Sequence, residues 1–339
     1  MAASGLARQW ETRLALIAAC RIDRYAGRNQ EGPMLTKVLA IALASSFIAA
    51  APGAARADQP CRLMLATSLD MVPDADGNPT IPVSINGKDA RMLIDTGGVY
   101  SMVTGTAASA LGLRGEPIQP GVFYMTVYGQ TLSRKATAET FAVGRLKLAH
   151  YGFLVMPGDM LDATLAGIVG PDILRRFDIE LDFAGGKFNV FSQDHCEGKV
   201  VYWSDDYAVL PLEIDETGHI TADATLDGKA VKVLIDTGGS RSFMTVGAAR
   251  DLFGLETKDL TQLRPGTSGK DPIYGHVFQS LDLAGISVRN PNFLLRPDKS
   301  SAEREQIILG MSVLAKLHLY IAYGEKRLYV TAAGADKPK

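Results

Sequence analysis

Met92-Leu93-Ile94-Asp95-Thr96-Gly97-Gly98 and Val233-Leu234-Ile235-Asp236-Thr237-Gly238-Gly239 are two nearly identical stretches, one in each half of this chain. Each is an apolar run, typical of a buried strand, that leads into Asp-Thr-Gly, a sequence suited to a tight turn. Each copy is therefore expected to present a carboxylate at the end of a strand. Two copies allow two carboxylates to meet across a two-fold axis.

The similarity between the two halves begins before these stretches. Asp74–Gly77 matches Asp215–Gly218, and Asn86–Lys88 matches Asp227–Lys229, and both pairs keep the spacing of the two aspartates. Asn-Gly and Asp-Gly favour hairpin turns because these residues tolerate positive φ. The matching turns predict that the chain contains an internal duplication.

A further matching pair lies downstream, where Ile168–Gly170 corresponds to Ile308–Gly310 with the spacing almost unchanged. Many short strands, Gly-rich turns and few helices predict an all-β fold, mainly β with short helices. Two homologous lobes are expected to be related by a pseudo-two-fold axis. The expected helices are 107–111, 171–177, 248–253 and 311–317, and the expected closing hairpins pair 179–183 with 187–190 and 319–323 with 327–330.

The duplication predicts how the chain is divided, because a repeat of about 125 residues is too long for a solenoid unit. The predicted parts are a cleaved leading segment at 1–57, an N-terminal lobe at 58–192, a linker at 193–206, a C-terminal lobe at 207–331 and a tail at 332–339.

Each copy resembles a unit of the retropepsin-like and pepsin-like aspartic peptidases. The hallmarks are a hydrophobic residue before Asp-Thr-Gly and, well downstream, two hydrophobic residues and a glycine before a short helix. The resemblance covers residues 66–331, and the arrangement is similar to that of the bacterial two-lobed aspartyl proteases. It implies an aspartic-type endopeptidase, a hydrolase that acts on a peptide or protein substrate as a monomer. It implies neither a metal nor an organic cofactor.

The resemblance assigns Asp95 and Asp236 to a catalytic dyad. Two carboxylates about 3 Å apart cannot both ionise easily, so one keeps its proton. The ionised carboxylate takes a proton from a water molecule, and the neutral one donates a hydrogen bond to the substrate carbonyl. The pair therefore activates water without a covalent nucleophile.

Four neighbouring residues are expected to support the dyad. Thr96 and Thr237 should hydrogen-bond across the pseudo-two-fold axis and lock the two turns together. Gly97 and Gly238 should let the backbone pass closely and offer amide donors to the carboxylates.

Gly98 and Gly239 depart from the pepsin-like pattern, in which a Ser or Thr follows Asp-Thr-Gly and supports the carboxylate. Without that hydroxyl group the dyad should be less acidic. The hypothesis is therefore a pH optimum shifted toward neutral, which a strictly acidic optimum would refute.

Family members close a hairpin flap over the substrate. The candidate hairpins here are 121–135 and 264–278, with Tyr124, Tyr128 and Tyr274 as side chains that could pack on a substrate. The two segments differ in sequence, so an asymmetric cleft is expected.

Residues 34–57 resemble a signal peptide, with a basic start, an apolar run and a small-x-small site that predicts cleavage after Ala57. The protein is therefore expected to be periplasmic or secreted. Residues 1–33 carry eight charged residues and no clear periodicity, and we interpret Met34 as the true start. The rival interpretation is a lipid-modified Cys20 at the end of a short apolar stretch.

Cys61 and Cys196 are the cysteines of the expected mature chain. An even count behind an export signal favours a disulfide bond between them. Two unpaired buried thiols are the alternative.

The net charge is −2 and the charges are interspersed, without a basic stripe or polybasic cluster. No nucleic-acid partner and no stable membrane anchor are therefore expected. The chain has five histidines and no Cys-x-x-Cys or His-x-x-x-His spacing, so no metal site is expected.

Several other polar residues are given structural interpretations. Glu180 with Arg175–Arg176 is interpreted as a solvated edge, and Asp182 as structural because Ala322 takes its place in the second copy. The scattered histidines are interpreted as surface or hydrogen-bonded residues, and these are His195, His219, His276 and His318.

Two alternatives to a general endopeptidase stay open. One is a non-catalytic peptide-binding protein that keeps the fold and the dyad but has a blocked cleft. The other is a processing enzyme with one native target. Turnover of a mixed peptide library would separate these interpretations.

Overall fold

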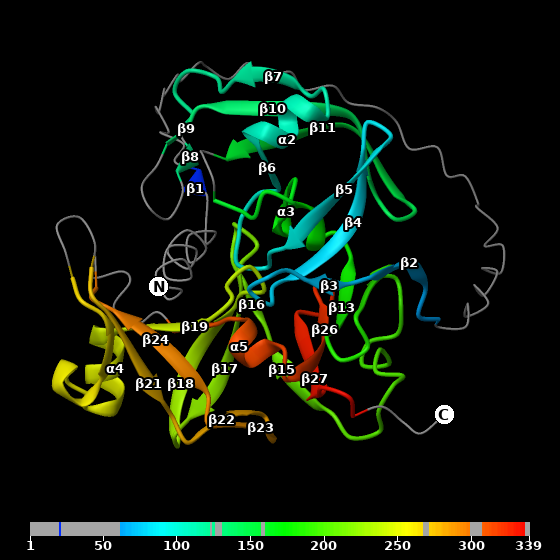
Figure 1. Ribbon diagram of the computed structural model, residues 1–339. Helices are drawn as coiled ribbons and strands as arrows, with labels where there is room; N and C mark the ends of the chain where they lie inside the picture. The colour runs from blue at the N-terminus through cyan, green and yellow to red at the C-terminus, as the bar shows by residue number, and fades with distance from the viewer. Residues whose placement is uncertain are drawn as a thin grey trace, which may run out of the picture.

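A computed structural model describes residues 62–122, 124–125, 131–156, 160–266, 271–298 and 307–335, and the backbone of residues 20–21. The chain forms two β-rich lobes and a further sheet, which lies below the N-terminal lobe and beside the C-terminal lobe in the view of Figure 1. The predicted mainly β fold with two homologous lobes is confirmed.

The N-terminal lobe is one eight-stranded sheet. Its strand β4 pairs with both β5 and β10, so the sheet curls back on itself. In sheet order the strands are β3 (Val72–Pro73), β4 (Pro79–Ile85), β5 (Lys88–Ile94), β12 (Gly167–Val169), β6 (Met102–Thr104), β11 (Leu146–Met156), β10 (Arg134–Val143) and β7 (Arg114–Pro117).

The C-terminal lobe repeats this plan in a ten-stranded sheet, in which β17 pairs with β18 and β22 as β4 pairs with β5 and β10. In sheet order the strands are β20 (Thr261–Arg264), β21 (Ile273–Val277), β24 (Asn292–Arg296), β19 (Ser242–Thr245), β25 (Ile307–Leu309), β18 (Lys229–Ile235), β17 (Ile220–Leu226), β22 (Ser280–Leu283) and β23 (Ile286–Arg289), with β16 (Glu213–Ile214) beside β17.

The closing hairpins of both halves join one six-stranded sheet. Strand β13 pairs with β26, placing Glu180 opposite Tyr320, so the two halves share a continuous hydrogen-bonded layer. In order the strands are β15 (Ala208–Pro211), β27 (Arg327–Ala332), β26 (Leu317–Ala322), β13 (Asp178–Asp182), β14 (Lys187–Phe191) and β2 (Leu65–Asp70).

Short elements complete the fold. A small sheet contains β1 (Cys20–Arg21), β8 (Tyr124–Met125) and β9 (Thr131–Leu132). The helices are α2 (Gly105–Ala110), α3 (Pro171–Leu174), α4 (Val246–Phe253) and α5 (Met311–Leu314), with a 3₁₀ turn η1 at Thr257–Asp259. None of the helices among these residues is long and apolar enough to cross a membrane.

The hairpin turns predicted from Asn-Gly and Asp-Gly are present in both lobes. Asn86 and Gly87 have φ of 51° and 75°, and Asp227 and Gly228 have φ of 46° and 77°. These turns join β4 to β5 and β17 to β18, which sets the register that carries each Asp-Thr-Gly to the lobe interface.

The interpretation of Glu180 as part of a solvated edge is wrong. Its side chain is 2% exposed, because β13 is covered by neighbouring strands and by the segment that follows β14. His318 Nε2 lies 2.8 Å from its Oε1, and Asn189 and Tyr202 donate to its Oε2 at 2.7 and 2.6 Å. A carboxylate on a central strand needs such partners to be buried.

The predicted bridge between Cys61 and Cys196 involves Cys61, which lies outside the described residues, so the pairing stays a prediction. The predicted signal peptide at 34–57 also lies outside the described residues and stays a prediction. The position of the Cys20 backbone in β1 does not test Cys20 as a lipid-modification site.

Candidate active site

Both aspartates follow strands that are held in parallel pairs. Ile94 of β5 pairs with Val169 of β12, and Asp95 N–H donates to Val169 O at 3.0 Å. In the other lobe Ile235 of β18 pairs with Leu309 of β25, and Asp236 N–H likewise donates to Leu309 O at 3.0 Å. The downstream glycine segments recognised in the sequence thus fix the ends of the strands that carry the aspartates.

The two threonines cross between the lobes. Thr96 Oγ1 donates to Ile235 O at 2.8 Å and accepts from Thr237 N–H at 3.1 Å. Thr237 Oγ1 donates to Ile94 O at 2.7 Å and accepts from Thr96 N–H at 3.1 Å. These four hydrogen bonds are buried and tie the two turns into one unit.

Each carboxylate is held by its own turn. Asp95 Oδ1 accepts from the amides of Gly97 and Gly98 at 3.0 and 2.8 Å. Asp236 Oδ1 accepts from the amides of Gly238 and Gly239 at 2.8 and 3.1 Å.

The second oxygen of each aspartate, Oδ2, does not share the backbone amide donors of Oδ1. Asp95 Oδ2 and Asp236 Oδ2 are buried, and among the described residues neither accepts a hydrogen bond from an amide or a hydroxyl group. The two carboxyl groups interact with each other.

Burial raises the pKa of both members of the pair. The side chains of Asp95 and Asp236 are 0% exposed. Desolvation and the nearby charge of Asp236 raise the pKa of Asp95 well above its usual range. Desolvation raises the pKa of Asp236 to about 6, although the amides of Gly238 and Gly239 oppose this shift. Both carboxyl groups are therefore harder to ionise than an exposed aspartate.

A polar network lies behind each Asp-Thr-Gly turn and differs between the lobes. Asp172 at the start of α3 accepts from the amide and the hydroxyl of Ser101, both at 2.8 Å, and from the Tyr151 hydroxyl. Gly170 N–H donates to Ser101 Oγ at 3.0 Å. Desolvation raises the pKa of Asp172, and its hydrogen bonds oppose this shift.

The C-terminal lobe has a serine where the N-terminal lobe has Asp172. Ser242 N–H donates to Ser312 Oγ at 2.9 Å, and Gly310 N–H donates to Ser242 Oγ at 3.1 Å. Both lobes therefore have a serine that accepts from the downstream glycine amide, but its next partner is acidic only in the N-terminal lobe, where it is Asp172. These residues were not predicted from the sequence, although their spacing follows the duplication.

The three candidate flap tyrosines have different environments. Tyr124 of β8 stacks edge-on against Tyr100, which closely follows the Asp95 turn, with ring centroids 5.3 Å apart. Tyr274 of β21 packs against the main hydrophobic core. Tyr128 lies outside the described residues.

His219 is a further residue at the site that the sequence analysis did not assign to it. It follows the Asp215–Gly218 turn, and its Nε2 lies 2.9 Å from the carbonyl oxygen of Gly97 in the opposite lobe. The signal for it was the duplication itself, because the equivalent position in the first half of the chain is Asn78.

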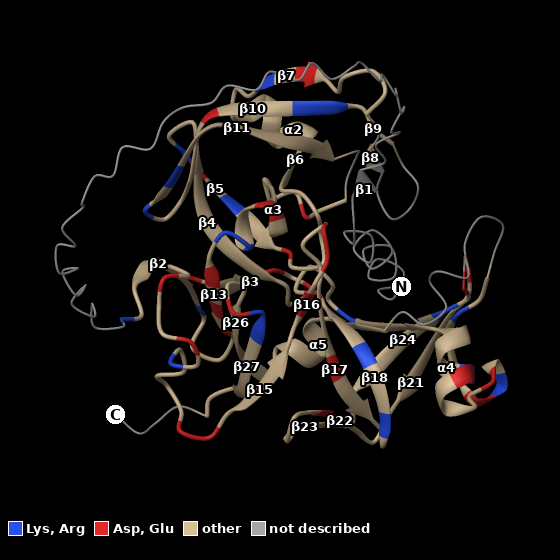
Figure 2. Cartoon of the chain, turned by 180° about the vertical axis from the view of Figure 1, so that it is seen from behind, with Lys and Arg blue, Asp and Glu red and all other residues tan. Residues whose placement is uncertain are grey.

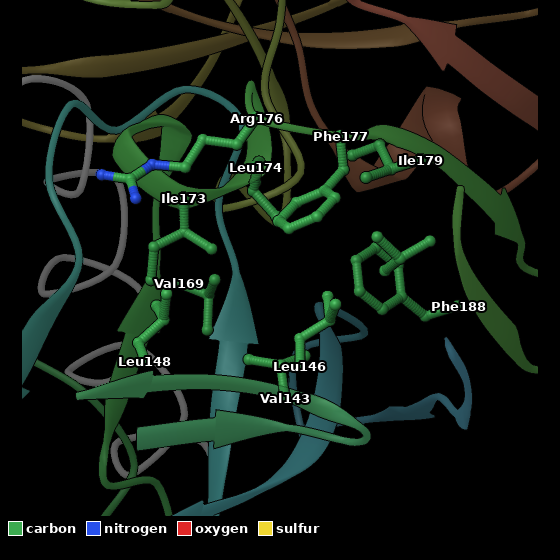
Figure 3. Close-up of a pocket in the computed structure, with 11 residues that line it drawn as sticks. Val143, Leu146, Leu148, Val169, Ile173, Leu174, Arg176, Phe177, Ile179 and Phe188 are labelled. Carbon is green, nitrogen blue, oxygen red and sulfur yellow. The ribbon is translucent and has the colours of Figure 1, made fainter. Parts of the chain in front are cut away.

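Other features of the molecule are separate from the dyad. Acidic and basic residues are interspersed over both lobes (Figure 2). An apolar cavity lies between the β10–β11 hairpin, α3 and the shared sheet, where Ile173, Phe177 and Phe188 face one another (Figure 3). Among the described residues no group of three or more His, Cys, Asp or Glu side chains could hold a metal ion.

Paired lobes that each bring one Asp-Thr-Gly turn to a common axis define the acid-protease fold. Residues 81–173 and 222–313, together more than half of the chain, match the model of a family described as Aspartyl protease. The chain belongs to this aspartyl protease family.

Basic 7S globulin from soybean is a similar solved structure, with 12% sequence identity and a TM-score of 0.48, over 82% of this chain and 100% of that chain. A comparison with curated proteins found no match.

Proposed function

We propose that the protein is an aspartic endopeptidase in which Asp95 and Asp236 together activate a water molecule to hydrolyse a peptide bond. The observation that carries this proposal is the pairing of two buried carboxyl groups that interact with each other and whose Oδ2 atoms accept no hydrogen bond from an amide or a hydroxyl group among the described residues. Membership of the aspartyl protease family supports it.

The proposed roles need one ionised and one protonated carboxyl group. Asp236 is proposed as the base that takes a proton from water. Asp95, whose pKa is raised by burial and by the charge of Asp236, is proposed to keep its proton and to donate a hydrogen bond to the substrate carbonyl. The proton taken by Asp236 then passes to the leaving amine.

The substrate is proposed to lie extended between the lobes and to add main-chain hydrogen bonds of the strand type. The hairpin β8–β9 with Tyr124 is proposed as the flap on the N-terminal side. We also propose that the protein is exported through the segment at 34–57 and acts as a monomer. Cell fractionation and sedimentation of the purified protein test these two points.

The experiment for the proposed function is cleavage of a diverse peptide library between about pH 3 and pH 8 by the protein and by Asp95→Asn and Asp236→Asn. Asp89→Asn is the matched control, because Asp89 is exposed and lies on the same strand that leads to Asp95. Cleavage by the parent and by the control, with loss in both dyad variants, is expected. Absence of cleavage by the parent, with retained binding of peptides, would instead support a peptide-binding protein.

A further inference from the structure

The two lobes carry different side chains, Asn78 and His219, at equivalent positions after a turn. The turn at Asp74–Gly77 and the turn at Asp215–Gly218 have the same hydrogen bonds, since Asp74 Oδ1 accepts from Asn78 N–H and Asp215 Oδ1 accepts from His219 N–H, both at 3.0 Å. Equivalent turns therefore present an amide side chain in one lobe and an imidazole in the other.

The partners of His219 offer an acceptor to each ring nitrogen. The Gly97 carbonyl oxygen, which can only accept, lies 2.9 Å from Nε2. Thr217 Oγ1 lies 3.0 Å from Nδ1, and its own hydroxyl group donates to Asp215 Oδ1 at 2.6 Å. A ring that donates to both partners is an imidazolium.

The charges around His219 favour that state. Asp215 Oδ2 lies 3.4 Å from Nδ1, and the imidazole is 15% exposed. The pKa of Asp215 is lowered, because hydrogen bonds from Thr217 and the charge of His219 outweigh desolvation. Arg175 lies at the same turn and donates to Glu216 O at 3.1 Å, and the charge of His219 also acts on Asp236.

We propose that His219 is held as an imidazolium against the catalytic turn of the opposite lobe and makes Asp236, rather than Asp95, the ionised member of the dyad. His219 is thus a positioning residue, because it makes the two aspartates of a nearly symmetric pair unequal in their tendency to ionise. His219 contacts Gly97, whose backbone lies directly against the Asp236 carboxyl group, and the positive charge of His219 opposes the rise in the pKa of Asp236.

This inference deepens the proposed function and rests on it for the roles in catalysis. The test uses His219→Gln, which keeps a donor for the Gly97 carbonyl but removes the charge, and His219→Asn, which copies Asn78. His150→Asn is the control, because that histidine is 75% exposed and pairs with Glu139 at 2.9 Å.

The first measurement is the pH dependence of kcat/KM on a cleaved peptide. In His219→Gln the acid limb should move upward by about 0.5–1 pH unit, since the base loses a nearby positive charge, while the melting temperature stays unchanged. His150→Asn should leave the profile in place. A His219→Gln profile that superimposes on that of the parent would overturn the inference.

The second measurement does not need turnover. In protein labelled with ¹³C at the aspartate carboxyl carbon, the Asp236 signal is identified by its loss in Asp236→Asn and followed against pH. Its midpoint should rise by the same amount in His219→Gln. A shifted midpoint in a protein that cleaves nothing would keep the inference and reject the peptidase, whereas an unchanged midpoint in an active enzyme would do the reverse.

Discussion

Gly97 lies directly against the carboxyl group of Asp236, since a Cβ atom placed on Gly97 would come within 2.4 Å of Asp236 Cγ. Gly238 stands in the same relation to Asp95, where the corresponding distance to Asp95 Cγ is 2.5 Å. Each lobe therefore uses its glycine to make room for the aspartate of the other lobe.

Gly97→Ala is expected to lower activity by at least about 100-fold, because an added methyl group displaces Asp236 from its partner and misplacement of about 1 Å costs that much. Steady-state cleavage and thermal unfolding measure the effect. Gly105→Ala is the control, since its added Cβ would meet nothing closer than Val155 Cγ1 at 3.9 Å. Full activity in Gly97→Ala would contradict the described packing.

Gly239→Ser tests the missing hydroxyl group next to the dyad. A Cβ at this position would lie 2.9 Å from Asp236 Oδ2, so a small local shift is required. A serine hydroxyl that donates to Oδ2 should lower the pKa of Asp236 and move the acid limb of activity downward by about 0.5–1 pH unit. Gly239→Ala has the steric effect alone and should not move the limb. An equal shift in both variants would exclude the hydrogen bond as the cause.

Thr96→Val is expected to destabilise the protein by about 2–4 kcal/mol, because it removes a buried hydrogen-bonding group. The substitution leaves the buried Thr237 N–H without an acceptor and the Ile235 carbonyl without a donor. Urea unfolding measures the change. Thr96→Ser keeps the hydroxyl and should lose much less stability, so equal losses in the two variants would show that the hydroxyl group is not what matters.

The dyad should make stability fall as the pH rises. A carboxyl group whose pKa is higher in the folded state binds its proton more tightly there, so its contribution is present below the unfolded pKa and is lost as the pH passes the folded pKa. For Asp236 this window runs from 3.8 to about 6, and for Asp95 it extends higher.

Between about pH 4 and pH 7 the free energy of unfolding should therefore decline by on the order of 3 kcal/mol through Asp236, and further through Asp95. Asp236→Asn should remove the contribution of Asp236 from that decline, which denaturant unfolding at a series of pH values measures. A pH dependence identical to that of the parent would show that Asp236 titrates normally.

Glu180→Ala is expected to cost about 2–4 kcal/mol of stability, because it removes the shared hydrogen-bond partner of Asn189, Tyr202 and the buried His318. Glu139→Gln, on an exposed side chain, is the control. Chemical unfolding distinguishes the two, and a near-neutral Glu180→Ala would contradict the importance of this network for the shared sheet.

The duplication made much of the fold predictable. Each half of the chain repeats a hairpin turn, a strand and Asp-Thr-Gly, and these short patterns specify local structure. The downstream segments Ile168–Gly170 and Ile308–Gly310 pair with the strands that carry the aspartates. Local patterns of this kind identify the elements and the order in which they occur.

What the sequence did not show depends on long-range pairing. Glu180 looked solvated because its neighbours Arg175 and Arg176 are charged, whereas β26 and β14 flank its strand and bury it. His219 looked like a scattered polar residue because its partner, the Gly97 carbonyl, lies far away in the sequence and in the other lobe. Neither contact has a signature in the residues next to it.

The measurement that tests the central claim most directly is a double-mutant cycle on kcat/KM with Asp95→Asn, Asp236→Asn and the two combined. If the carboxyl groups act as one acid–base unit, each single variant should lose at least about 1,000-fold and the double variant should lose no more than the worse single variant. Losses that multiply in the double variant, or a single variant that keeps its activity, would contradict a dyad shared between the lobes.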